Sequence, residues 1–274
     1  MSLTAHIQPP VPPPERPPWR PWTAPGALVL GVVGALVLAS VAYVIAAIAT
    51  GHSKSTAGGN IAATILGDFA FIGAALFFAQ LSARPTPEQF GPRPTPLTRA
   101  LPAMAVGYGI FWVFTMLWLG LLGSSTKDHT LDDLGQSTAA LAAAAILVSV
   151  IAPIAEEFLF RGYIFTALRG RLGVLRAAAV TGVLFGLIHV DPNRPASFLL
   201  PLAVFGFLLC LIYWRTGSLY PCIALHSINN AIAFGVTEGW SWQIPLVAIG
   251  ALVAITAVLA PTRRLGRAWP ATAG

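Results

Sequence analysis

Residues 139–168 read AALAAAAILVSVIAPIAEEFLFRGYIFTAL, an apolar run that also carries two carboxylates and a guanidinium. The run is long enough to cross a membrane, because a span needs about 20 mostly apolar residues. A charged side chain near the bilayer centre costs about 2.5–3.5 kcal/mol even on the lenient insertion scale, so it faces a protein interior or a watery cavity. We therefore expect Glu156, Glu157 and Arg161 to mark a functional site inside a helical bundle.

The rest of the chain has the same apolar character. Its 274 residues are 56% hydrophobic and only 9% charged, and its mean hydropathy is +0.74. Soluble domains carry about 25% charged residues. The net charge of +6 could suit nucleic acid, but the positive residues lie in short loops between apolar runs, as membrane topology requires. We expect an all-α polytopic membrane protein that contacts the lipid bilayer and no nucleic acid.

Eight apolar runs are candidate membrane spans, and we expect them to enclose an intramembrane active site. They cover approximately Gly26–Thr50, Ile61–Leu81, Ala100–Gly123, Ala139–Leu168, Val174–Val190, Phe198–Arg215, Leu219–Val236 and Trp242–Ala260. The first run is too long for a signal-peptide core of about 7–15 residues, so we expect no cleaved signal. The predicted organisation is a proline-rich disordered tail (1–25), an eight-helix domain (26–262) with its motifs at about 139–236, and a basic tail (263–274).

The positive residues also predict an orientation. With the N-terminus in the cytosol, twelve Lys or Arg residues fall in cytosolic segments and three in external loops, Arg161 being counted as intramembrane. An excess of Lys and Arg on the cytosolic side is the usual rule. We therefore expect an integral protein of the cell membrane with both termini cytosolic.

The two adjacent glutamates cannot share one direction. They lie about 100° apart on a helix with 3.6 residues per turn. Arg161 follows Glu157 by four residues, which is a favourable order for an ion pair. We expect Glu157 to pair with Arg161 and Glu156 to point elsewhere, free to act as a base.

Two further spans carry histidines at helical spacing from another distinctive residue. His189 follows Phe185 by four, and Asn230 follows His226 by four. A neutral imidazole and a carboxylate can hold and deprotonate a water molecule, while an imidazole and a carboxamide can donate hydrogen bonds to a developing oxyanion. Phe185 suits packing better than chemistry. Glu156, His189 and His226 could also form a zinc site with one open position.

Other polar and sulfur-bearing residues in the spans suit structural roles. Cys210 and Cys222 belong to no ligand cluster and are expected to be small buried hydrophobes. Asn229 faces away from Asn230 and suits an interhelical hydrogen bond. Asp68 stands alone in its run and suits a structural hydrogen bond. Counted from the loop at Arg171 at 1.5 Å per residue, Glu156 and His189 lie roughly 22 and 27 Å deep in the membrane. Part of residues 163–178 must therefore form a bent or interfacial helix, which Gly162, Gly170 and Gly173 would permit.

The ordered set EExxxR, FxxxH and HxxxN resembles the CAAX protease and bacteriocin-processing (CPBP) family of intramembrane proteases. Here the motifs are Glu156–Arg161, Phe185–His189 and His226–Asn230, and the resemblance covers about residues 141–235. It implies a membrane endopeptidase with a cavity open to the cytosol. It also implies that Glu156 and His189 activate water, that His226 and Asn230 stabilise the oxyanion, and that Glu157 and Arg161 support them. No cofactor is expected on this mechanism, with zinc as the alternative.

Several readings of function stay open at this point. The sequence does not name the substrate: for a peptidase we expect a membrane-associated peptide or protein, and prenylated C-terminal peptides, signal-like peptides and bacteriocin or pheromone precursors are all open. A non-catalytic scaffold or bacteriocin-immunity protein on the same fold is one alternative. A proton-coupled transporter is another, although few polar residues lie in the first three spans to form its pathway.

Overall fold

The computed structural model describes residues 17–51, 56–122 and 137–261. This part of the chain is helical, with turns and no strand, in the order α1 (Thr23–Thr50), α2 (Ala57–Gln80), α3 (Pro87–Phe90), α4 (Leu97–Leu122), α5 (Thr138–Ile146), the π-helix η2 (Leu147–Ile151), α6 (Ala152–Glu157), the π-helix η3 (Phe158–Phe165), α7 (Thr166–Leu172), α8 (Val174–Leu187), the 3-10 turn η4 (Ala196–Phe198), α9 (Leu199–Thr216), α10 (Leu219–Thr237) and α11 (Gln243–Leu259). The all-α class is confirmed.

Six of these helical stretches are long and apolar enough to cross a membrane. The other two apolar helices, α8 and α11, have 14 and 17 residues. At 1.5 Å per residue they reach about 21 and 26 Å, less than the hydrocarbon thickness of about 30 Å. All eight predicted runs therefore form apolar helices, and the chain is a polytopic membrane protein, but two of the eight are shorter than full spans.

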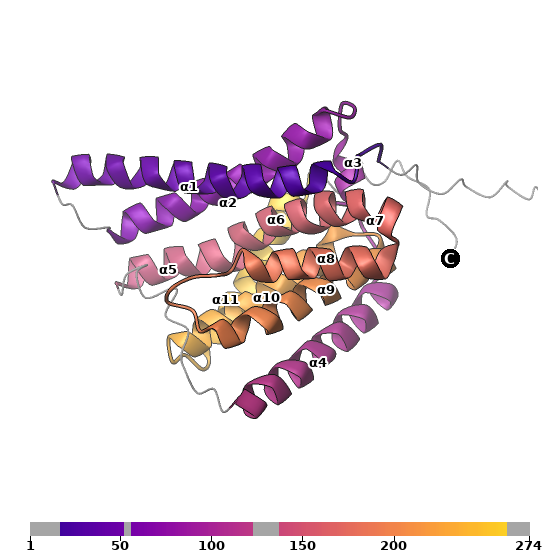
Figure 1. Ribbon diagram of the computed structural model, residues 1–274. Helices are drawn as coiled ribbons and strands as arrows, with labels where there is room; N and C mark the ends of the chain where they lie inside the picture. The colour runs from indigo at the N-terminus through magenta and orange to yellow at the C-terminus, as the bar shows by residue number, and fades with distance from the viewer. Residues whose placement is uncertain (1–16, 52–55, 123–136, 262–274) are drawn as a thin grey trace, which may run out of the picture.

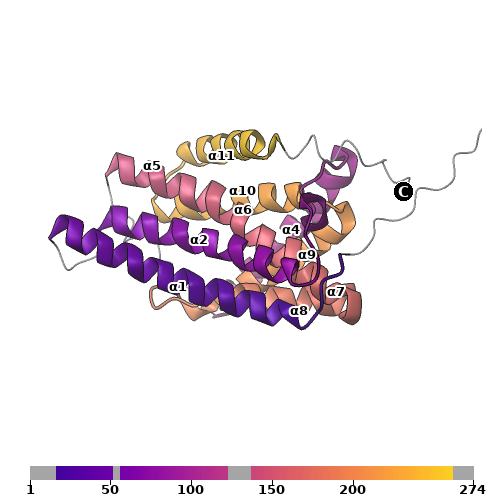
Figure 2. The ribbon, with the colours of Figure 1, turned by 90° about the horizontal axis from the view of Figure 1, so that it is seen from above.

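The helix that carries the glutamates is central. α5, η2, α6, η3 and α7 follow one another without a break, and α2 packs along one side of this continuous helix (Figure 1). α1 pairs with α2 outside it, while α10 packs against its other side and is covered by α11 (Figure 2). α8 and α9 form a close pair, and α4 lies against α9. The apolar surface that helices need to bury is thus arranged around the motif helix.

The bend expected within 163–178 lies at one residue. Gly173 has φ +75°, a left-handed conformation that favours glycine, and it separates α7 from α8. The two other glycines of the region, Gly162 and Gly170, lie inside helices. At Gly162 a Cβ would stand 3.2 Å from the carbonyl oxygen of Phe90, so this glycine permits close packing.

The close pairing of α8 with α9 depends on glycine. A Cβ at Gly182 would stand 2.6 Å from the oxygen of Ala203 and 2.7 Å from the nitrogen of Phe207. A Cβ at Gly186 would stand 2.8 Å from the oxygen of Leu199. Small residues of this kind let helix backbones approach closely in membrane proteins. The approach brings the end of α8, and His189 in the turn that follows it, against the centre of the bundle.

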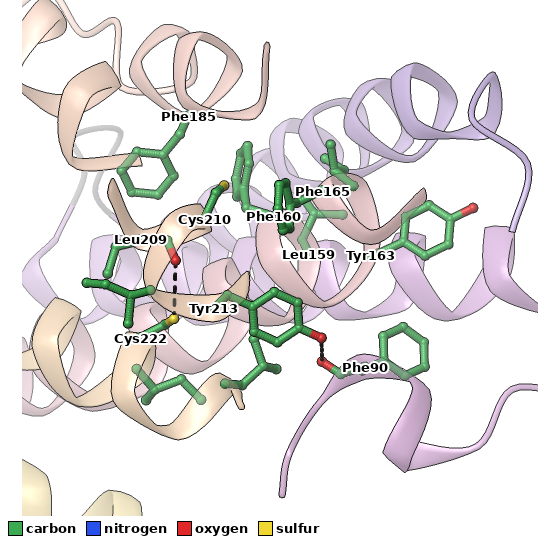
Figure 3. Close-up of a cluster of buried hydrophobic side chains, with 14 of the residues drawn as sticks. Phe90, Leu159, Phe160, Tyr163, Phe165, Phe185, Leu209, Cys210, Tyr213 and Cys222 are labelled. Carbon is green, nitrogen blue, oxygen red and sulfur yellow. Dashed lines mark hydrogen bonds between the residues drawn. The ribbon is translucent and has the colours of Figure 1, made fainter. Parts of the chain in front are cut away.

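A buried aromatic cluster packs the end of the bundle near α3 and α7 (Figure 3). Phe90 stacks on Phe158 with ring centroids 4.2 Å apart. Trp19 is 5% exposed, and its ring lies 4.7 Å from Phe90 and 4.9 Å from Tyr163. The last part of the predicted proline-rich tail is therefore anchored by an aromatic side chain. Residues 1–16 of that tail and the predicted basic tail lie outside the described residues.

Candidate active site

A proline shapes the motif helix just before its glutamates. Pro153 has no N–H to give to the carbonyls of the preceding turn, and that turn is the π-helix η2. The N–H of Ala152 reaches back five residues to the carbonyl of Leu147. The carbonyls of Val148 and Ser149 are then available to side chains of α10. Local π-turns of this kind are frequent at functional sites.

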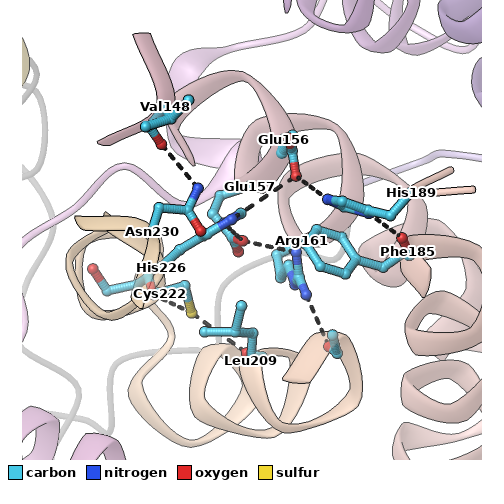
Figure 4. Close-up of polar contacts among 12 residues, drawn as sticks. Val148, Glu156, Glu157, Arg161, Phe185, His189, Leu209, Cys222, His226 and Asn230 are labelled. Carbon is cyan, nitrogen blue, oxygen red and sulfur yellow. Dashed lines mark hydrogen bonds and ion pairs between the residues drawn. The ribbon is translucent and has the colours of Figure 1, made fainter. Parts of the chain in front are cut away.

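α10 binds both of those carbonyls. Asn230 Nδ2 donates to the oxygen of Val148 at 2.8 Å (Figure 4), and Ser227 Oγ donates to that of Ser149 at 2.5 Å. Buried carbonyls are nearly always paired, so these bonds fix the rotation and register of α10 on the motif helix. They also hold His226, next to Ser227 in the chain, opposite the glutamates.

Glu157 is the centre of a buried ionic network. Its Oε1 accepts from Arg161 Nη1 at 2.7 Å and faces His226 Nδ1 at 2.8 Å. Arg161 Nη2 donates to the oxygen of Gly206 on α9 at 2.9 Å. The side chains of Glu157 and Arg161 are fully buried, and that of His226 is 3% exposed. The ion pair predicted from the four-residue spacing is therefore present, and it also orients an imidazole.

Glu156 points to a different place, as adjacent residues on a helix must. Its Oε2 lies 3.8 Å from His189 Nε2 and 3.9 Å from His226 Nε2 (Figure 4). The Oε2 atom is buried and accepts no hydrogen bond from any described residue. The side chain of Glu156 is 12% exposed and that of His189 18%. The three motifs, from three helices, thus converge on one carboxylate oxygen.

The Nδ1 atoms of His189 and His226 fix the orientation of the two imidazole rings. His189 Nδ1 lies 2.6 Å from the carbonyl of Phe185, which can only accept, so this nitrogen carries the proton. His226 Nδ1 faces the Glu157 carboxylate and carries its proton for the same reason. Both Nε2 atoms therefore face Glu156. A ring of His189 that carries its proton at Nδ1 presents a lone pair there.

The side chain of Phe185 packs among these groups without a polar role. Its ring lies 4.7 Å from that of His189 and 5.6 Å from that of His226. The guanidinium carbon of Arg161 lies 4.6 Å from the centre of the same ring, a cation–π distance. Phe185 thus holds both imidazoles and the guanidinium in place, as the sequence suggested for a packing residue.

Glu156, His189 and His226, the ligands of the predicted zinc alternative, lie together, but Glu156 stands farther from the two imidazoles than zinc ligands stand from one another. Ligands at 2.0–2.2 Å from a tetrahedral zinc stand roughly 3.4 Å apart, whereas Glu156 Oε2 stands 3.8 and 3.9 Å from the two imidazoles. No group of three His, Cys, Asp or Glu among the described residues could hold a metal ion. We derive no step through a metal for this arrangement.

The remaining polar residues of the spans fall outside this cluster. Cys210 and Cys222 are free and buried, as expected. Asn229 accepts a hydrogen bond from Tyr108 Oη at 3.4 Å, the interhelical contact predicted for it. Asp68 is 5% exposed, and its Oδ2 has no hydrogen-bond partner among the described residues, so that oxygen does not make the structural hydrogen bond expected of this side chain.

Ser227, Pro153 and Tyr108 support the site but were not singled out from the sequence. Ser227 lies inside the HSINN motif segment, where a hydroxyl among apolar residues was a usable signal. Pro153 lies three residues before Glu156, and a proline within a helix predicts freed carbonyls. Tyr108 gave no such signal, because its partner lies on a distant helix.

Comparisons with known proteins match the segment of the chain that carries this site. Residues 138–232 match the family described as type II CAAX prenyl endopeptidase Rce1-like. A Bacillus subtilis (strain 168) protein named "Putative membrane peptidase YdiL" is 33% identical over 85 residues, 31% of this chain and 33% of that protein. The Lactococcus lactis subsp. lactis (strain IL1403) protein "UPF0177 protein YxdF" is 28% identical over 111 residues, 40% of this chain and 58% of that protein.

This chain thus spans about a third of one curated relative and somewhat over half of the other. No solved structure matches it. The matched segment begins at the start of α5 and ends in α10, so it contains every residue of the three motifs. The resemblance to the CAAX protease family that these motifs indicate is therefore confirmed for residues 138–232.

Proposed function

We propose that this protein is an intramembrane endopeptidase of the CAAX-protease type, which hydrolyses a peptide bond in a membrane-associated peptide or protein. The observation that carries the proposal is the convergence of His189 Nε2 and His226 Nε2 on Glu156 Oε2, at 3.8 and 3.9 Å. Two imidazoles fixed at their far nitrogens and a carboxylate with no other partner form an acid–base site. Structural packing alone does not require this arrangement.

Glu156 and His189 are the groups that activate water. Both offer acceptor atoms, since His189 donates through Nδ1 to Phe185 and has its Nε2 lone pair free. A water molecule between them gives one hydrogen bond to each and keeps an oxygen lone pair for attack on the peptide carbonyl carbon. Glu156 takes the proton as the new C–O bond forms, and then passes it to the leaving amine.

His226 and Asn230 are the groups that stabilise the developing oxyanion. With a proton at Nε2 as well as at Nδ1, His226 is a donor toward the oxyanion, and the Glu157 carboxylate at Nδ1 lies opposite the charge of the ring. Asn230 uses one amide hydrogen on Val148 and keeps a second for substrate. Donors fixed before the reaction stabilise the charge without reorganisation. Glu157 and Arg161 act as positioning residues.

The substrate class follows from the setting of the site. A site enclosed by apolar helices favours a peptide that is itself held in the membrane, by an apolar segment or by a prenyl chain. The distribution of Lys and Arg favours the cell membrane with both chain termini cytosolic. On that orientation the substrate approaches from the cytosolic leaflet.

The test is cleavage of a panel of fluorogenic prenylated and signal-like peptides by the purified protein in proteoliposomes. Glu156→Gln keeps the shape of the side chain and removes the base, so we expect no cleavage above background from a folded protein. Glu238→Gln, at the end of α10 and away from the cluster, is the matched control and should cleave like the wild type. Cleavage by Glu156→Gln would overturn the mechanism. Absence of cleavage by the wild type across the panel would favour a scaffold or immunity protein.

A further inference from the structure

A groove separate from the catalytic cluster runs between α4, α9 and the start of α8. Its volume is about 470 Å³, within the roughly 300–1,000 Å³ of small-molecule sites. Aliphatic side chains line most of it, among them Val106 and Ile110 of α4 and Leu208 and Leu211 of α9.

The groove has the length of one membrane leaflet. Along α4 its lining runs from Thr98 to Ile110. From Arg99 to Ile110 the helix rises about 16 Å, and half of the hydrocarbon core is about 15 Å. A Cβ at Gly107 would stand 2.9 Å from Ile212 Cδ1, so α4 touches α9 along the floor of the groove. A single extended hydrocarbon chain fits this shape better than a compact ligand.

One end of the groove is positively charged. Arg99 and Arg215 both line it, and the guanidinium group of neither forms an ion pair or hydrogen bond among the described residues. Trp214 lies beside them and is 54% exposed. Tryptophan prefers the level of the lipid headgroups, and arginine pairs readily with phosphate. The polar end of the groove therefore lies where a headgroup would be.

We propose that this groove binds an anionic phospholipid, with one acyl chain along α4 and α9 and the phosphate between Arg99 and Arg215. The pairing of an apolar channel with two unpaired guanidinium groups at its mouth distinguishes this site from the surrounding lipid-facing surface. The proposal does not depend on peptidase activity. On this proposal the lipid lies one helical turn from Phe111. The ring of Phe111 packs 4.8 Å from that of Phe205, which lies beside the catalytic cluster.

Brominated lipid quenching of Trp214 tests the site. The protein is reconstituted in phosphatidylcholine vesicles doped with brominated phosphatidylglycerol or, separately, brominated phosphatidylcholine. The Trp214 signal is the difference between each protein and its Trp214→Phe counterpart. Each arginine that meets an anionic headgroup favours it roughly 5-fold. We expect half-quenching at a mole fraction of phosphatidylglycerol roughly 5- to 30-fold below that of phosphatidylcholine.

Two sets of variants locate the effect. The double substitution Arg99→Gln with Arg215→Gln should abolish the preference for phosphatidylglycerol over phosphatidylcholine. Val106→Phe, which narrows the groove, should weaken quenching by either lipid. Arg84→Gln with Arg171→Gln is the matched control, because it removes the same charge from exposed positions outside the groove. Equal quenching by the two lipids in the wild type, or an unchanged preference in Arg99→Gln with Arg215→Gln, would overturn the proposal and leave ordinary lipid contact.

Discussion

Replacing Glu157 with glutamine removes the charge at the centre of the buried network. The substitution leaves Arg161, which is fully buried, without its 2.7 Å partner, and it weakens the 2.8 Å contact to His226 Nδ1. Removing one partner of a buried ion pair costs about 3–5 kcal/mol. The carboxamide oxygen still accepts one hydrogen bond, so we expect a loss near the lower end, about 3 kcal/mol.

The assay is thermal unfolding of the purified protein in detergent, followed by cleavage at a temperature where the variant stays folded. For a chain of this size about 3 kcal/mol lowers the midpoint by roughly 6–12 °C. Glu156→Gln is the control, and we expect its midpoint to stay within about 2 °C of the wild type, because Glu156 Oε2 accepts no hydrogen bond in the part of the chain that the structure describes.

A double variant separates charge from shape. Replacing a buried ion pair by apolar side chains of similar volume is often neutral. Arg161→Met removes the buried guanidinium that Glu157→Gln leaves without a partner, so the combined variant should recover much of the lost midpoint. Cleavage should stay low, since His226 has lost its negative partner. An unchanged midpoint in Glu157→Gln, or no recovery in the double variant, would refute the proposed role of this network.

Three further substitutions test the packing that holds the site. Ser227→Ala leaves a buried carbonyl of the π-turn unpaired, so we expect a loss of about 1–3 kcal/mol in denaturant unfolding and a lower kcat with little change in KM. Gly182→Ala places a methyl group against the α9 backbone and should cost about 1–3 kcal/mol, whereas Gly109→Ala, which meets no atom within 4 Å, should cost nothing measurable. Trp19→Ala empties the aromatic cluster and should cost about 3–5 kcal/mol; an unchanged midpoint would show that this anchor is dispensable.

Much of the fold and the site could be predicted because polar groups are rare in an apolar chain. Each predicted span corresponds to a helix, since an apolar run in a membrane has few alternatives. The spacing of Glu157 and Arg161 predicted their ion pair from helix geometry alone. Glu156, His189 and His226 could be expected to meet because each was costly to bury on its own.

What could not be predicted depends on the register between helices. The two freed carbonyls of η2 follow from Pro153, but only the placement of α10 shows that Ser227 and Asn230 bind them. The sequence suggested a single role for Asn230, in stabilising the oxyanion. In the structure, one of its amide hydrogens binds the carbonyl of Val148 and so holds the motif helix. The end of α8 at Leu187, two residues before His189, could not be predicted either, because the apolar run continues to Val190.

The most direct test of the central claim is peptide cleavage by the metal-free protein, with Glu156→Gln beside it. The protein is treated with a strong chelator, its zinc content is checked, and cleavage of the best peptide from the panel is measured before and after zinc is added back. Glu156 and His189 as the water-activating pair predict full cleavage after chelation and none from Glu156→Gln. Cleavage that disappears with the metal and returns with zinc would contradict this mechanism.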